Sequence, residues 1–156
     1  MGLFYRLRVK EFIGIILFIV FVIFAVIVFK DNGDEHYTKK IKSLKPGESI
    51  TVSEIFDFEF DRAYVFDEPY IPGEHLAEIY NLDISIDEGK VDSVTDNCGR
   101  IVFVDKNGEY IYHYVYFKND ILLQERVVLF PSTIIQANID TSCGRYTLEF
   151  VEAIEF

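Results

Sequence analysis

Carboxylate side chains crowd one short stretch of the chain, where Asp57, Glu59 and Asp61 alternate and Asp67 and Glu68 follow. If this stretch is a strand, alternate residues project from one face, so the first three carboxylates would lie together. Paired carboxylates can perform acid and base catalysis or bind Ca²⁺. A carboxylate-dependent envelope hydrolase is therefore one candidate function.

No motif with a catalytic mechanism accompanies these carboxylates. The chain has no G-x-S-x-G, no H-E-x-x-H, no P-loop and no glycine-rich dinucleotide turn. The Asp-x-Asp-x-Asp-Gly pattern of a calcium loop is also missing, and residues 105–108 (DKNG) fit a hairpin turn better. The two cysteines and the scattered His36, His75 and His113 lack zinc-ligand spacing. We therefore expect no enzyme, with no catalytic residue, metal or cofactor.

Four tyrosines, Tyr110, Tyr112, Tyr114 and Tyr116, occupy every second position of one predicted strand. This spacing places all four on the same face. Tyrosine supplies a large rigid contact area with a polar tip, so an exposed row would form a recognition surface. The alternative is a row packed under a helix or loop, because aromatic residues are ordinary strand formers. The row is the candidate binding site on the first interpretation and part of the core on the second.

Both cysteines stand in a Cys-Gly-Arg sequence that directly precedes a predicted strand. If the starts of these strands meet at one end of a sheet, Cys98 and Cys143 can form a disulfide. Such a bridge would stabilise the fold by about 4 kcal/mol in an oxidising compartment. Two free buried thiols are the alternative, and we favour the disulfide.

The second half of the chain predicts most of a sheet. Three β-rich runs cover residues 101–104, 110–117 and 121–130. Asn107-Gly108 between the first two is a strong hairpin signal. A second hairpin is predicted over residues 134–139 and 145–151, after the break at Pro131.

The first half adds fewer elements. Residues 62–66 predict a short strand, and a helix should run from Pro72 to about Asn81. Residues 50–60 fit either a strand or a short capped helix. The expected fold class is α+β, a mainly antiparallel sheet of five or six strands with one packed helix.

An apolar run precedes all of this. Residues 12–29 (FIGIILFIVFVIFAVIVF) contain no charge, amide or hydroxyl. As an α-helix they would cover about 27 Å, close to the hydrocarbon thickness of a bilayer. A cleaved signal peptide is the competing interpretation, but its apolar core is shorter and ends in small residues, whereas Ala25 is followed by Val-Ile-Val-Phe. We therefore predict a retained transmembrane helix that contacts the lipid bilayer.

Basic residues on both sides of the apolar run indicate which end of the predicted helix lies in the cytoplasm. Arg6, Arg8 and Lys10 precede the run, and a short basic tail before a first apolar helix normally stays in the cytoplasm. Lys30 and four later lysines follow it, and those four begin ten residues beyond the run. We expect a single-pass protein of the cell membrane, with its N-terminus in the cytoplasm and its C-terminal domain outside.

The predicted organisation has four parts: a cytoplasmic tail (1–11), a transmembrane helix (12–29), a linker (30–47) and an extracytoplasmic domain (48–156). The linker is polar, lacks apolar periodicity and closes with Pro46-Gly47. Its lysines could hold it against anionic headgroups, or it is a soluble tether.

Charge narrows the class of partner. From Asp31 onward there are 11 Lys and Arg and 25 Asp and Glu, so the net charge is 11 − 25 = −14. Nucleic acid requires a basic surface, so it is excluded as a partner. The acidic field favours cationic partners or metal ions, and ordinary solvation is the alternative.

Residues 56–74 (FDFEFDRAYVFDEPYIPGE) resemble a segment of small uncharacterised bacterial envelope proteins that are membrane-anchored or lipid-anchored. In those proteins an F-D-x-W-D-x-x-Y-x-F strand precedes P-Y and a short helix, and Phe60 stands here where Trp is common. The resemblance covers about 20 residues and carries no catalytic residue. It implies location and fold, and we expect an interaction module that recognises another envelope component, most simply a protein.

Overall fold

The computed structural model describes residues 33–140, 144–151 and 153–156. These contain three helices, α2 (Gly33–Lys42), α3 (Val52–Ile55) and α4 (Gly73–Ile79). Their nine strands are β1 (Ser49–Thr51), β2 (Arg62–Phe66), β3 (Cys98–Val104), β4 (Tyr110–Phe117), β5 (Ile121–Leu123), β6 (Val127–Leu129), β7 (Ile134–Asp140), β8 (Arg145–Val151) and β9 (Ile154–Glu155). The predicted transmembrane helix, residues 12–29, lies outside the described residues. Within them, no helix is both long and apolar enough to cross a bilayer.

The strands form two sheets, so the predicted fold of one sheet with one packed helix is wrong. Sheet A has the order β1-β7-β8-β5, and sheet B has the order β4-β3-β2-β6-β9. The division occurs inside residues 121–130, which the sequence predicts as a single strand. Arg126 adopts a left-handed conformation with φ 56°, and the chain passes there from β5 in sheet A to β6 in sheet B.

The main hydrophobic core, called here the central core, lies between the two sheets. Alternate residues of both sheets enter it, among them Ala63, Val65, Ile101, Phe103, Ile135, Ala137 and Leu148. Helix α3 adds Val52 and Ile55. This helix resolves the ambiguity of residues 50–60, because a strand ends at Thr51 and a capping box with Glu54 starts the helix there.

Helix α2 also enters the central core through the buried Tyr37 and Ile41, and the buried Leu44 follows directly after the helix. The sequence analysis assigns these residues to a polar linker and starts the domain at Glu48. The structure instead has a compact unit that begins at Gly33. The helix was missed because three apolar residues at spacings of four and three, among four lysines, make a narrow apolar stripe.

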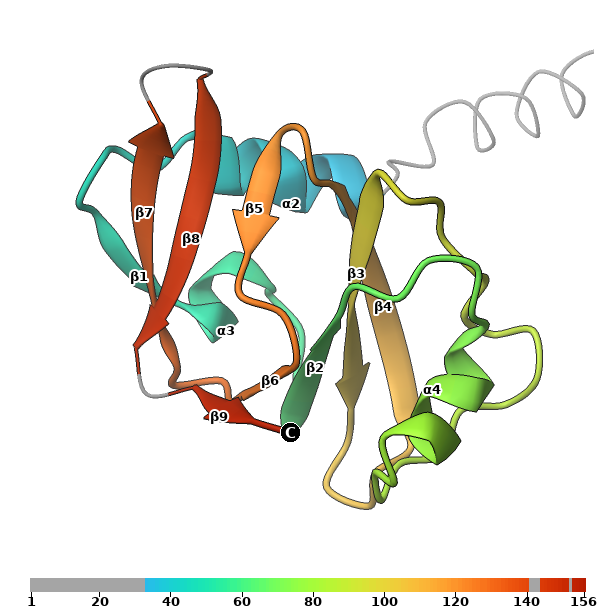
Figure 1. The fold of residues 1–156 in the computed structure, drawn as a ribbon. Helices are drawn as coiled ribbons and strands as arrows, with labels where there is room; N and C mark the ends of the chain where they lie inside the picture. The colour runs from blue at the N-terminus through green and yellow to red at the C-terminus, as the bar shows by residue number, and fades with distance from the viewer. Residues whose placement is uncertain (1–32, 141–143, 152) are drawn as a thin grey trace, which may run out of the picture. The chain divides into compact units, whose positions relative to one another are not determined.

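A second core, called the α4-side core, covers the opposite face of sheet B. Figure 1 shows α4 on the side of sheet B that faces away from sheet A. Leu76 of α4 and Val91 of the following loop pack there with Tyr64 and Phe66 of β2 and with Val102 and Val104 of β3. Every residue of β3 is buried in consequence. The predicted helix after Pro72 and both predicted hairpins are confirmed.

Candidate functional site

A β-bulge divides the tyrosine row. The pairing of β4 with β3 skips Ile111, and this extra residue reverses the side on which the preceding residue projects. Tyr110 therefore packs on the α4-side core, whereas Tyr112, Tyr114 and Tyr116 pack on the central core. The prediction that all four share one face is wrong because alternation holds only along an unbroken strand.

The row holds α2 in place. Tyr112 donates a hydrogen bond to Asp34 Oδ1 at 2.8 Å, and the hydroxyls of Tyr114 and Thr38 lie 2.8 Å apart. Tyr114 is 0 % exposed and Tyr116 is 2 % exposed. Burial raises the pKa of Tyr114 to about 12, and the hydrogen bond with Thr38 opposes that rise. These side chains belong to the core, as the alternative interpretation of the row expects.

The predicted carboxylate group is dispersed. Asp57 accepts a hydrogen bond from the hydroxyl of Tyr37 at 3.2 Å, which ties the chain after α3 to α2. Asp67 forms an ion pair with Lys118 at the end of β4. These two carboxylates therefore act as structural partners of separate elements.

Glu59 and Asp61 do come together, in a groove of about 380 Å³. Its lining residues are Glu59, Phe60, Asp61, Asp105, Lys106 and Ile111. Asp61 is paired with Arg62 at 3.1 Å. Backbone N–H groups of the hairpin turn donate to Asp105 and lower the pKa of its carboxyl. Among the described residues, no group of three or more His, Cys, Asp and Glu side chains could hold a metal ion.

Cys98 is buried at the start of β3, and its sulfur lies 3.5 Å from Thr95 Oγ1. It has no disulfide partner among the described residues. Cys143 lies outside the described residues, so the bridge between them stays a prediction. The rest of the Cys-Gly-Arg sequence has a separate role. A Cβ atom at Gly99 would come within 2.3 Å of the Tyr116 side chain, so only glycine leaves room for Tyr116 in its observed position.

Arg100 is the largest polar side chain that the fold buries, with 0 % exposure. It projects from β3 to the α4 side of sheet B and donates to three main-chain carbonyls. Nη1 donates to Asp92 O at 2.7 Å, while Nη2 donates to Glu68 O at 3.2 Å and to Ile71 O. Burial lowers the pKa of Arg100, and the charges of Glu68 and Glu74 oppose that shift. One guanidinium therefore ties the loop after β2 to the loop before β3.

Tyr70 stands at the tip of the loop that Arg100 holds. Its φ is 61°, a conformation that is uncommon for a bulky residue and costs on the order of 1 kcal/mol or more. Its N–H donates to Val94 O at 2.8 Å, and its hydroxyl donates to Asp96 Oδ2 at 3.2 Å. The side chain nevertheless remains 66 % exposed, the largest value among the exposed large hydrophobic residues. The loop thus presents an aromatic ring to solvent on a fixed backbone.

Further contacts fix the same loop. The Glu68 carboxylate accepts a hydrogen bond from Tyr80 of the α4 end, and it lies 3.4 Å from Arg126 Nε. Pro69 and Pro72 restrict the backbone on both sides of Tyr70. Because the loop is already ordered, binding a partner would cost little conformational entropy here.

Phe117 of sheet B is a second exposed aromatic residue. It lies opposite Cys98 at the end of β4, and Cys98 follows closely after Asp96, the partner of Tyr70. Its side chain is 63 % exposed. The two most exposed aromatic side chains of the described residues are thus placed toward the same end of sheet B. We call Tyr70, Asp96 and Phe117 the Tyr70 surface.

Two features of the sequence point to the Tyr70 surface, although no motif marks it. Arg100 is a lone charge in a run of apolar β-formers, which indicates a buried guanidinium with main-chain partners. Tyr70 lies in Pro69-Tyr70-Ile71-Pro72, where two prolines flank a two-residue segment in the same stretch that carries the family resemblance.

No known protein family, curated protein or solved structure matches this chain.

Proposed function

We propose that this protein is a single-pass membrane protein whose extracytoplasmic domain binds another protein of the cell envelope through the Tyr70 surface. The apolar run at residues 12–29, bounded by charged residues, supports the anchor. The basic residues before it support a cytoplasmic N-terminus.

The exposed, conformationally fixed Tyr70 carries the binding proposal. Residues held in costly backbone conformations cluster at functional sites, where the surrounding structure compensates for the strain. Here Arg100 stabilises the strained loop, although its own burial removes the guanidinium from water. Tyrosine is enriched among residues that dominate binding energy because it combines apolar area with a polar tip. The buried guanidinium of Arg100 holds the loop that exposes Tyr70, and this arrangement supports a role for Tyr70 in contacting a partner.

The test is site-specific photocrosslinking in intact cells that carry the full chain. A benzoylphenylalanine in place of Tyr70 should give a discrete protein adduct that mass spectrometry can identify. The same probe at Ile154, which is 57 % exposed on β9, is the matched control and should give no such adduct. Equal adducts at both positions, or none at position 70, would contradict the proposal.

A carboxylate-dependent hydrolase is the second candidate, favoured by the groove that Glu59 and Asp61 share. The purified full chain would be incubated with isolated cell-wall material, and soluble fragments would be measured. If the protein is a hydrolase, the unaltered chain should release soluble fragments. The double variant Glu59→Gln, Asp61→Asn should release none, although its melting temperature is unchanged. Absence of release by the unaltered protein would remove this candidate.

A further inference from the structure

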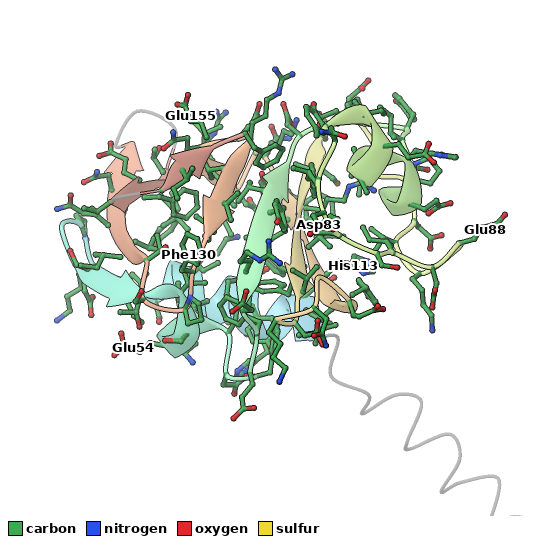
Figure 2. The ribbon with its side chains drawn as sticks, turned by 90° about the horizontal axis from the view of Figure 1, so that it is seen from below. Glu54, Asp83, Glu88, His113, Phe130 and Glu155 are labelled. Atoms are coloured by element: carbon green, nitrogen blue, oxygen red, sulfur yellow. The ribbon has the colours of Figure 1, made fainter. Side chains whose placement is uncertain are left out.

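Strand β4 is a long, uncharged edge of sheet B. It pairs with β3 on one side, and in the sheet order no strand follows it on the other. At its first residue, Tyr110 N–H donates to Ser85 O at 3.0 Å. Its eight residues, YIYHYVYF, include no charge and no proline. Natural edge strands usually carry such residues because they discourage pairing with other chains. The lack of both makes this edge a place where a further strand can be added. Figure 2 labels His113 near the middle of this strand.

The register shows which main-chain groups face outward. Lys118 N–H donates to Asn97 O, so the hydrogen-bonded pairs with β3 fall at Tyr112, Tyr114 and Tyr116. The N–H and C=O groups of His113, Val115 and Phe117 therefore point away from β3.

Some of these outward groups are already used, and the rest define the open edge. The Tyr110 hydroxyl lies 2.9 Å from His113 Nδ1 and also faces the His113 N–H. The Phe117 carbonyl accepts from Asp120 N–H in the following turn. The open edge thus consists of the His113 C=O, both main-chain groups of Val115 and the Phe117 N–H. None of these four groups has a partner in the described part of the chain.

We propose that this open edge binds an extended, positively charged segment of another protein as an added β-strand. The donors and acceptors that it offers match those of a strand about five residues long. The charge of the occupant follows from the surroundings. The negative charges of Asp34 in α2 and Asp92 in the loop before β3 act on His113, and the positive charge of the buried Arg100 acts against them. A second copy of this chain, whose net charge is −11, would repel this edge. This inference does not depend on Tyr70.

The test uses the full chain in detergent with fluorescent octapeptides and measures binding by anisotropy. The probe alternates lysine and valine. One control replaces lysine by glutamate, and the other keeps lysine but is N-methylated along one edge, which removes main-chain donors without changing charge. We expect the lysine–valine probe to bind at least tenfold more tightly than either control. Equal binding of the N-methylated peptide would show electrostatic attraction alone and overturn the proposal.

A matched pair of variants locates the binding. Proline is tolerated where an edge-strand N–H faces solvent, so Val115→Pro removes one outward donor but no bond to β3. It should weaken binding at least tenfold, and Val115→Thr should leave binding unchanged. Tyr70→Ala should also leave it unchanged, which separates this edge from the Tyr70 surface. Unaltered binding by a folded Val115→Pro variant would overturn the proposal.

Hydrogen exchange gives an answer even if Val115→Pro fails to fold. In the unaltered protein the amides of Val115 and Phe117 should exchange fast, and the bound peptide should slow both at least tenfold. The amides of Tyr114 and Tyr116 are already bonded to β3 and should not change. The proposal would be contradicted if exchange at Val115 and Phe117 did not change. It would also be contradicted if sedimentation showed a dimer that forms through this edge.

Discussion

The tyrosines of β4 and Tyr70 are the same residue type in opposite settings. Tyr114 is fully buried, and its hydroxyl bonds with Thr38 of α2, while Tyr70 is 66 % exposed on a loop with φ 61°. The first setting uses the aromatic ring to fill a core and the hydroxyl to fasten a helix. In the second, the Tyr70 ring is not packed in a core, and a strained backbone holds it in solvent. A regular row of tyrosines can therefore be structural, while a single tyrosine in a strained loop is the better binding candidate.

The largest effect is expected when two rings of the row are removed. Tyr112→Ala with Tyr114→Ala should unfold the domain, because truncating a buried aromatic residue costs roughly 3–5 kcal/mol and a small domain has only about 5–15 kcal/mol of stability. Thermal unfolding followed by circular dichroism is the measurement. Tyr112→Phe with Tyr114→Phe, which keeps the rings, should remain folded. A double alanine variant with an unchanged melting temperature would mean that the row is not core.

A smaller loss is expected when the support of Tyr70 is removed. Arg100→Met keeps most of the buried volume but leaves three carbonyls without their donor, at about 1–3 kcal/mol for each unsatisfied group. The melting temperature should fall, and amides of residues 91–96 should exchange faster than those of β7. Equal acceleration in both regions would show general destabilisation and not a local clamp.

Alkaline pH tests the buried tyrosines without mutation. Burial raises the pKa of Tyr114 to about 12, above the ordinary value near 10. The folded domain therefore holds this proton longer than the unfolded chain, so its contribution to stability is complete below pH 10 and is lost as pH rises toward about 12. Urea unfolding across this range should show the decline, and Tyr114→Phe should reduce it. A decline of the same size in that variant would contradict the assignment.

The smallest effect on stability is expected at Tyr70. Tyr70→Asn places a residue that tolerates the left-handed conformation in the loop, so stability should stay within about 1 kcal/mol of the unaltered protein. Tyr70→Val, which is β-branched, should be the less stable of the two. Urea unfolding of both variants measures this, and the reverse order would mean that the loop is not strained at this residue.

Local signals in the sequence predicted local structure. Asn107-Gly108 located a hairpin and Pro72 the start of α4, because the conformational restriction acts on those residues themselves. The division into two sheets depends on a left-handed Arg126, which no residue preference favours, and α2 is held by tyrosines more than 70 residues away in the chain. The Tyr70 surface likewise depends on Arg100, Asp92 and Asp96 from another part of the chain. Such contacts appear only once the sheet brings distant segments together.

The central claim is that Tyr70, and not the tyrosine row, makes the contact with a partner. Its most direct test measures partner capture from intact membranes by the full chain and by Tyr70→Ala, with both melting temperatures recorded. We expect at least a tenfold loss of capture at a melting temperature within a few degrees of that of the unaltered protein. Undiminished capture by a folded Tyr70→Ala variant would contradict it.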